Sequence, residues 1–184
     1  MSTSTQLMTA EELIRLPRGQ YRYELINGEL ITMSPAGHDH GRVTLRIASP
    51  LSRFVWDQKL GEVFAAGTGF KLTSNPDTVL APDVCFIKEE RAKDLRKSKG
   101  YWPGPPDLAV EVFGANDRKA KVQAKALQWL RYGATEVWLV DLQHETVSIY
   151  RSGVEVITLT KEQELSAENL IPGFRLPLSA VFVL

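Results

Sequence analysis

The stretch Pro106-Asp107-Leu108-Ala109-Val110-Glu111-Val112-Phe113 is a short apolar run with one glutamate in its middle. Apolar runs of this kind are typical of strands that are buried on both faces. A carboxylate between Val110 and Val112 would lose hydration worth several kcal/mol unless a charged or hydrogen-bonding group met it there. The sequence therefore predicts a partner for Glu111, and the identity of that partner decides most of the functional interpretation.

Composition and charge are those of an ordinary globular protein. The chain has 184 residues, 43% hydrophobic and 24% charged, which fits one domain over residues 1–184. Lys plus Arg and Asp plus Glu number 22 each, so any nucleic-acid binding would need a local basic patch. The single cysteine, Cys85, excludes an internal disulfide and a cysteine-based zinc site, and its apolar neighbours predict a buried side chain. With no signal peptide and no run approaching the roughly 18 apolar residues of a membrane span, we expect a cytoplasmic protein without membrane contact.

Local patterns predict a mixed α/β (α+β) fold with an N-terminal β-hairpin. Asn27-Gly28 between two apolar-polar runs is a strong hairpin signal, and a two-residue turn there places Glu24 and Glu29 on one face. Helical spacing runs from His40 to about Leu60, where Pro50 is expected to kink or split the helix. A second helix is expected from a cap at Asp117 to about Tyr132. Strands are expected over residues 62–65, 69–72, 79–87, 106–113, 136–141, 145–150 and 154–160, giving a mixed sheet with two main helices.

Strand alternation connects Glu111 with a second carboxylate. Asp83 begins a neighbouring candidate strand after Pro82, and if the two strands are adjacent, Asp83 and Glu111 converge on one oxygen-lined site. Two carboxylates plus water are the ligands that Mg²⁺ prefers, and Mg²⁺ or Mn²⁺ would supply the missing partner of Glu111. Asp107 shares the face of Glu111 but follows two prolines at a turn, so it is interpreted as structural.

A lysine would complete such a site by neutralising developing charge and by positioning or deprotonating an attacking water. Phe113 stands two residues after Glu111 on the same face, so the lysine must come from elsewhere. On the helix over residues 117–132, Lys125 falls beside Trp129 at the edge of the buried stripe. From there Lys125 can extend over the sheet toward Glu111, although a solvated lysine that covers apolar surface fits the spacing equally well.

Two further patterns have competing interpretations. His38-Asp39-His40 has the composition of a small metal site, but before a helix His and Asp more often cap the helix or stay solvated. The run from Lys88 to Lys99 is rich in Lys and Arg and is followed by Tyr101 and Trp102. It is interpreted as a surface lobe, either merely solvated or in contact with a phosphate backbone.

Several motifs occur in an order that matches a known family. They are Tyr23-Glu24-Leu25-Ile26-Asn27-Gly28-Glu29-Leu30, Ala81-Pro82-Asp83-Val84, Pro106 to Val112, Lys125, Tyr132 to Asp141, and Pro172-Gly173-Phe174. Together they resemble the Uma-two family of restriction-endonuclease-like proteins, within the PD-(D/E)XK nuclease superfamily. The resemblance implies a mixed central β-sheet flanked by helices, with Asp83 and Glu111 as metal ligands and Lys125 as the displaced lysine. It also implies an additional acid near the metal, either Glu24 or Glu29.

The resemblance implies a metal-dependent nuclease that hydrolyses phosphodiester bonds in nucleic acid, with DNA as the expected substrate. A homodimer is a further expectation, because enzymes that cut both strands need two sites. The alternative is a non-catalytic module that keeps the nuclease fold and binds nucleic acid or a protein partner. Neutral net charge and an exposed lobe bearing Trp102 would favour this alternative.

Overall fold

A computed structural model describes residues 7–17, 21–95 and 99–183 of the protein. Its helices are α1 (Ala10–Leu13), α2 (His38–Gln58), α3 (Glu89–Leu95), α4 (Lys119–Arg131) and α5 (Leu178–Val181). The sequence predicts α1 through a capping box, and Thr9 and Glu12 do exchange the two reciprocal hydrogen bonds of that motif. Within the described ranges, no helix combines the length and apolar character that crossing a bilayer requires.

Most strands belong to two sheets. The first, in the order β2-β1-β5-β4-β7, contains β1 (Arg22–Ile26), β2 (Glu29–Met33), β4 (Phe70–Thr73), β5 (Thr78–Leu80) and β7 (Trp102–Pro103). The second, in the order β11-β10-β9-β8-β6-β3, contains β3 (Gly61–Ala65), β6 (Val84–Lys88), β8 (Leu108–Phe113), β9 (Glu136–Asp141), β10 (Thr146–Arg151) and β11 (Ile157–Thr160). A small separate pair is formed by β12 (Glu164–Ser166) and β13 (Arg175–Pro177). In the second sheet β8 and β9 run parallel and the other neighbours antiparallel, which confirms the predicted mixed sheet.

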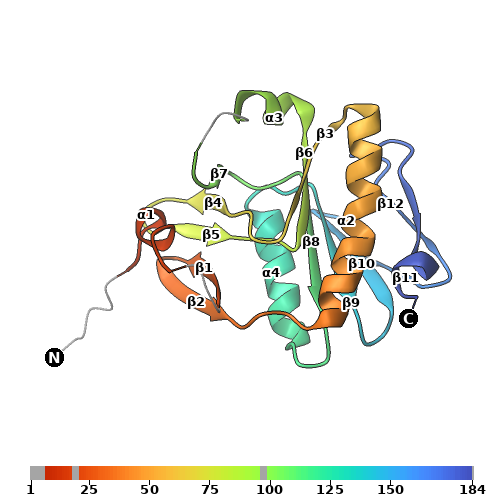
Figure 1. The fold of residues 1–184 in the computed structure, drawn as a ribbon, viewed down its shortest axis with the longest axis horizontal. Coiled ribbons are helices and arrows are strands. Elements are labelled where there is room, and N and C mark those ends of the chain that lie inside the picture. The colour runs from red at the N-terminus through yellow and green to blue at the C-terminus, as the bar shows by residue number, and fades with distance from the viewer. Residues whose placement is uncertain (1–6, 18–20, 96–98, 184) are drawn as a thin grey trace.

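The second sheet lies between the two long helices, α2 on one face and α4 on the other (Figure 1). Side chains of β8 alternate between these faces, as the period of a strand requires. Leu108 and Val110 belong to the core on the α2 side, whereas Ala109 and Phe113 belong to the core beneath α4. Glu111 therefore points to the α4 side, as the sequence predicts.

The N-terminal hairpin forms as expected from Asn27-Gly28. Both turn residues have positive φ, 52° at Asn27 and 78° at Gly28, which is the backbone that a two-residue turn of type I′ requires. The register pairs Glu24 with Ile31 and Ile26 with Glu29. This is the pairing that the two-residue turn predicts.

The helix around Pro50 is one continuous element, so of the two expected outcomes, a kink or a split, the split is wrong. α2 runs from His38 to Gln58 with Pro50 inside it. Its buried stripe, Val43, Ile47, Leu51 and Val55, continues through the proline against the second sheet. Burial of such side chains contributes about 1.5–3 kcal/mol each, which offsets the hydrogen bond lost at one proline.

The predicted strand over residues 79–87 is in fact two strands in different sheets. β5 ends at Leu80 and β6 begins at Val84, so the chain passes from the first sheet to the second at Ala81-Pro82-Asp83. Pro82 lacks the N–H that a continuing ladder would need, which explains why pairing stops there. Asp83 consequently lies at the junction of the two sheets.

Two other predictions are corrected at helix ends and loops. Asp117 does not cap α4, because the cap position is Arg118, and the Asp117 carboxylate instead accepts a hydrogen bond from the backbone N–H of Gly114 at 2.9 Å. Trp102 is not on an exposed lobe, because only 8% of its surface is accessible and its ring packs against Phe64 at 5.7 Å between centroids. Apolar packing therefore accounts for Trp102.

Candidate functional site

Asp83 and Glu111 lie next to each other, because β6 pairs directly with β8. The register places Val84 opposite Val110, and the Asp83 N–H donates to the Val110 carbonyl at 3.0 Å. The Asp83 carboxylate then accepts the backbone N–H of Val112 at 2.9 Å. The predicted adjacency of the two strands is confirmed, and it brings both carboxylates to the same end of the sheet.

Lys125 extends from α4 across the sheet, as its helical position predicts. Its Nζ lies 2.9 Å from Glu111 Oε1 and 2.8 Å from Glu24 Oε1, and it also donates to the Ala81 carbonyl at 3.4 Å. One ammonium group thus joins a glutamate of the first sheet to a glutamate of the second. The alternative of a merely solvated lysine does not fit these contacts.

Glu111 is almost completely buried, with 6% of its surface accessible. In addition to Lys125, its Oε1 accepts the indole N–H of Trp129 at 2.7 Å. Burial raises the pKa of Glu111 to about 7, helped by the nearby charges of Asp83 and Glu24 and opposed by Lys125 and Trp129. Lys125 and Trp129 are the charged and hydrogen-bonding partners that a buried Glu111 needs, but they do not fully compensate the buried charge, and a metal ion as its partner stays a prediction.

Asp83 is held by cationic and hydrogen-bonding groups from several elements. Arg22 Nη1 lies 3.1 Å from Asp83 Oδ1, and His40 Nε2 lies 3.1 Å from Oδ2. Burial raises the pKa of Asp83, but His40, the Val112 N–H and Lys125 together hold it below its ordinary value. Asp83 is thus kept ionised beside a glutamate that binds its proton more tightly.

The hairpin contributes Glu24 and not Glu29. Glu24 is buried, and its Oε1 accepts the backbone N–H of Ala81 at 2.9 Å as well as the Lys125 ammonium. Glu29 is exposed on β2. Both residues share one hairpin face, as predicted, but Glu29 lies nearer the turn and the first sheet does not bring it to the junction.

The sequence-based interpretation did not foresee Arg22, His40 and Trp129 as contacts of the carboxylates. Two of them left a signal. Arg22 precedes Glu24 by two residues on β1 and so shares its face, and Trp129 carries an indole N–H that needs an acceptor when buried. His40 belongs to the His38-Asp39-His40 pattern, but its contact with Asp83 was not foreseen, because that contact depends on how the start of α2 packs against the junction of the sheets.

Other candidates lie elsewhere or have structural partners. Asp107 accepts the Lys88 N–H at 2.9 Å and Arg91 Nη1 at 3.0 Å, in agreement with its structural interpretation. His38 is exposed on the first turn of α2 and contacts only Asp39 among the described residues. Cys85 is fully buried, and burial raises the pKa of its thiol.

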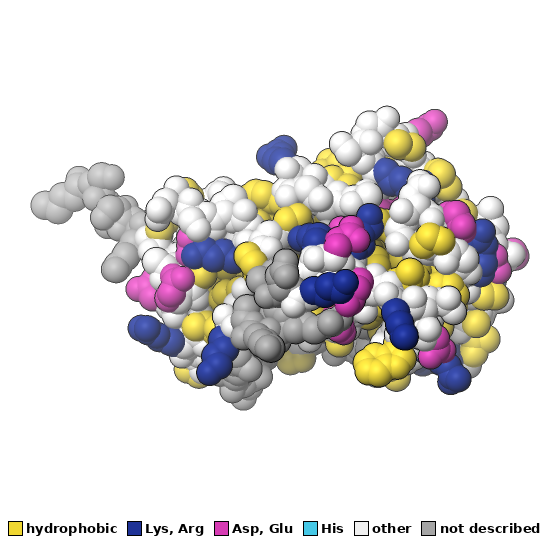
Figure 2. Space-filling model, turned by 90° about the horizontal axis from the view of Figure 1, so that it is seen from above, with side chains coloured by type: hydrophobic (Ala, Val, Ile, Leu, Met, Phe, Trp, Pro, Cys, Tyr) yellow, Lys and Arg dark blue, Asp and Glu magenta, His cyan; other side chains and the backbone are white. Residues whose placement is uncertain are grey.

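The charged run from Lys88 to Lys99 lies partly in α3, while residues 96–98 fall outside the described ranges. Figure 2 shows the face of the molecule at the top of Figure 1, where Lys and Arg side chains are interspersed with Asp and Glu. No broad field of one sign dominates this view. A phosphate contact by this run stays a prediction.

The donor set fits a hard divalent cation in its chemistry. Glu24, Asp83 and Glu111 supply carboxylate oxygens, and their formal charge exceeds that of Lys125 and Arg22 by one when His40 is neutral. Across residues 7–17, 21–95 and 99–183, no three His, Cys, Asp or Glu side chains are close enough to enclose a metal ion by themselves. Mg²⁺ does not need such a cage, since it keeps several waters and uses one or two carboxylates.

Comparison with known proteins identifies the fold of the chain. The chain is similar to the crystal structure of a protein from Anabaena variabilis, described as "a putative nuclease belonging to DUF820", with a TM-score of 0.80 and 22% sequence identity. The similarity covers 95% of this chain and 97% of that one, and it indicates a restriction-endonuclease-like fold. A search of curated proteins finds no match.

The chain belongs to the Uma2 family, described as "Putative restriction endonuclease", whose model matches residues 10–179. The family resemblance indicated by the sequence motifs is confirmed, together with the predicted fold class.

Proposed function

We propose that this protein is a divalent-metal-dependent nuclease that hydrolyses phosphodiester bonds in DNA. The observation that carries the proposal is the meeting of Glu24, Asp83, Glu111 and Lys125 at the junction of the two sheets. The four side chains come from β1, the β5–β6 connection, β8 and α4. Membership of a family of nuclease-like proteins supports a nucleic-acid substrate.

In this proposal Asp83 and Glu111 hold Mg²⁺ or Mn²⁺, and Glu24 is the additional acid. When bound, such an ion supplies Lewis-acid polarisation of a phosphoryl oxygen and neutralises developing negative charge. The excess of one carboxylate over the two cations Lys125 and Arg22, with His40 neutral, supports the assignment, because a further positive group would balance it. Lys125 contacts both Glu24 and Glu111, so it can stay paired with Glu24 while Glu111 turns its carboxylate to the metal ion.

Lys125 acts in this proposal as a hydrogen-bond donor and a positive charge. Burial lowers its pKa, but the carboxylates of Glu111 and Glu24 outweigh that effect and raise it above the ordinary value. A lysine held in its ammonium form cannot accept a proton from water. We therefore favour the role of orienting the attacking water or stabilising the charged phosphate over the role of a general base.

Arg22 is the cation best placed to contact the substrate. Two-fifths of its side chain is exposed while Nη1 contacts Asp83, so the guanidinium spans the buried carboxylate and the solvent. Its Nε is buried without a hydrogen-bond partner among the described residues. The exposed part of this side chain can bring an N–H donor to a phosphate oxygen while Nη1 keeps its contact with Asp83.

The test is a DNA cleavage assay with Mg²⁺ or Mn²⁺. Asp83→Asn and Glu111→Gln are expected to abolish cleavage, because each removes one anionic ligand with little change of shape. Glu29→Gln is the matched control on the same hairpin and should cleave like the wild type. Cleavage that survives both site substitutions would reject these roles.

Thermal unfolding separates the nuclease from a non-catalytic module that keeps the same fold. Mg²⁺ or Mn²⁺ is expected to raise the Tm of the wild type but to leave the Tm of Asp83→Asn unchanged. A wild-type Tm that ignores both metals would favour the binding module. Sedimentation with and without a DNA duplex would test the homodimer that double-strand cleavage calls for.

A further inference from the structure

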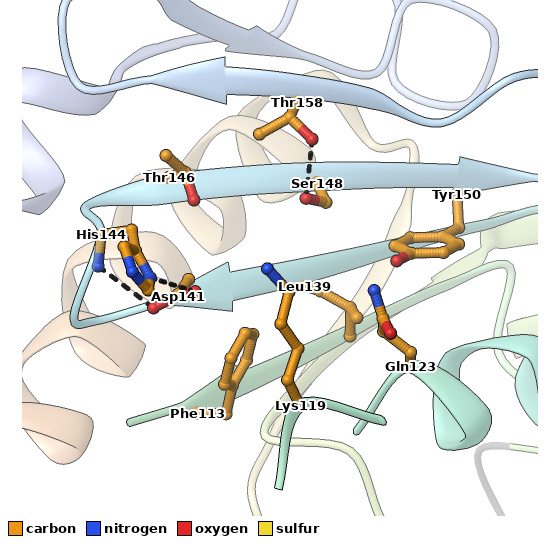
Figure 3. A pocket seen from close by; sticks show the side chains of 10 residues that line it. All are labelled: Phe113, Lys119, Gln123, Leu139, Asp141, His144, Thr146, Ser148, Tyr150 and Thr158. Atoms are coloured by element: carbon orange, nitrogen blue, oxygen red, sulfur yellow. Dashed lines mark hydrogen bonds and ion pairs between the residues drawn. The ribbon is translucent and has the colours of Figure 1, made fainter. Parts of the chain in front are cut away.

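A polar cavity lies on the opposite side of α4 from Lys125. It has a volume of about 270 Å³ and opens between the start of α4 and strands β9 and β10 (Figure 3). Lys119 and Gln123, four residues apart, face it from one side of the helix, whereas Lys125 is about 200° further round than Gln123 at about 100° per residue. The cavity is therefore separate from the carboxylate site, and a ligand bound there would be independent of the proposed nuclease function.

The start of α4 has the charges that a helix N-terminus normally avoids. No side chain caps the helix, no acidic residue lies in its first turn, and Arg118, Lys119 and Lys121 place positive charge there. The partial positive charge of a helix N-terminus disfavours cations and favours anions by about 0.3–1 kcal/mol each. Residues that lower the stability of a helix in this way are expected at positions that bind a ligand.

The cavity contains hydrogen-bond donors that the protein does not use. Lys119 has no ion pair or hydrogen bond to any described residue, and Figure 3 shows its ammonium group and the Gln123 amide directed into the cavity. Tyr150 is only 8% exposed, yet its hydroxyl points into the same space without a partner in the described part of the chain. The ring of Tyr150 is buried while its hydroxyl reaches the space of the cavity, so the Lys119, Gln123 and Tyr150 donors are available to an acceptor bound there.

The one carboxylate in the lining is hydrogen-bonded to the turn that follows β9. Asp141 accepts the backbone N–H groups of Gln143 at 3.0 Å and His144 at 3.1 Å, and its Oδ2 lies 2.9 Å from His144 Nδ1. Its oxygens are thus already engaged. The hydroxyls of Ser148 and Thr158, 2.9 Å apart, add further groups able to donate along β10 and β11.

The floor of the cavity is apolar. Phe113 and Leu139 are buried there and lie on the sheet face beneath α4, and the ring of Tyr150 adjoins them (Figure 3). A bare phosphate ion would make no favourable contact with this apolar surface, whereas a sugar or base would pack against it. We propose that the cavity binds a small organic phosphate of the mononucleotide class, with its phosphate at Lys119 and its apolar part on Phe113 and Leu139.

Calorimetric titration of the full chain, with a chelator present and ionic strength held constant, tests the proposal. The ligands are dAMP, ribose 5-phosphate, inorganic phosphate and deoxyadenosine. We expect dAMP to bind most tightly and deoxyadenosine not at all. Lys119→Gln should weaken dAMP binding at least about tenfold. Lys121→Gln, which removes the same charge from the first turn of the helix but outside the lining, should leave the affinity unchanged.

Tyr150→Phe removes only the hydroxyl and is expected to weaken dAMP binding several-fold, with the fold checked by circular dichroism. No binding of any phosphate compound, or equal losses in Lys119→Gln and Lys121→Gln, would overturn the site. Equal affinity for inorganic phosphate and dAMP would overturn the organic part of the ligand. Tighter, Lys119-dependent binding of an oligonucleotide without terminal phosphate would assign the phosphate to a nucleic-acid chain and overturn the mononucleotide form.

Discussion

Two buried glutamates on neighbouring parallel strands, Glu111 on β8 and Glu136 on β9, have partners of the same kinds. Each accepts an indole N–H, Glu111 from Trp129 at 2.7 Å and Glu136 from Trp138 at 2.5 Å. Each also contacts one long cation. For Glu136 this is Arg151, directly opposite on β10, whose Nε lies 2.6 Å away.

The difference lies in how many carboxylates share the cation. Arg151 contacts Glu136 alone among the described carboxylates, so the two charges cancel inside the sheet. Lys125 serves Glu24 as well as Glu111, and Asp83 adds a third carboxylate nearby. A balanced pair contributes to the fold, whereas a surplus of buried negative charge has to be relieved, either by protonation, as the raised pKa of Glu111 indicates, or by a further cation.

The largest expected difference concerns the two cations. Lys125→Gln should lower the cleavage rate by about 10²–10³-fold, the usual cost of removing one donor aimed at developing charge. Divalent metal should still raise the Tm of this variant, because Asp83 and Glu111 remain. Arg151→Gln should keep the cleavage rate at temperatures where it stays folded. The measurement is the initial rate on labelled DNA, and a full rate in Lys125→Gln would remove the lysine from the proposal.

The second difference is the direction in which substitution of each glutamate changes the free energy of unfolding. With a chelator at pH 8, Glu111→Gln should raise the free energy of unfolding by about 3 kcal/mol, because the pKa of Glu111 is raised from 4.5 to about 7. The protonated form stabilises the fold fully below pH 4.5, and that stabilisation is lost as the pH rises through about 7. Gln imitates the protonated form, so its advantage should vanish at pH 4.

Glu136→Gln should instead lower the free energy of unfolding by about 2 kcal/mol at pH 8, since Arg151 loses its charged partner. Urea denaturation of both variants beside the wild type measures the pair of effects. Changes of the same sign would mean that the two glutamates do not differ in the way described.

The smallest effect is the pH dependence of metal binding. A metal ion needs ionised Glu111, which at a pKa of about 7 is mostly protonated at pH 6 and mostly ionised at pH 8. The apparent affinity for Mg²⁺ should therefore rise by about tenfold over this interval, about 1.4 kcal/mol. Titrations followed by the Tm shift would reveal it, and an affinity that falls with rising pH would contradict it.

Much of the site could be predicted because its parts have local signals. Asn27-Gly28 fixes the register of the hairpin and hence the face of Glu24, and alternation along β8 fixes the face of Glu111. Helical angle places Lys125 beside Trp129. The convergence of these residues can be deduced once β6 and β8 are taken as neighbours, while their catalytic roles stay predictions.

The remainder depends on tertiary packing that the sequence does not display. Nothing local indicates that the chain changes sheets at Pro82 instead of continuing one strand, and the same holds for the contact of His40 with Asp83. Glu136 gives the same local pattern as Glu111, a glutamate at a buried strand. Only the structure distinguishes them, because the cation of Glu136 is supplied by the register of β9 and β10.

The bridge between Glu24 and Lys125 joins residues 101 positions apart in the chain. Contacts of such long range form late in folding, after the local hairpin and helices. A nascent chain, which folds from its N-terminus as it is synthesised, holds Glu24, Asp83 and Glu111 before α4 has emerged. The candidate site can therefore assemble only after the two sheets have packed together. A chain truncated before residue 125 would contain the three carboxylates but not the lysine that joins two of them.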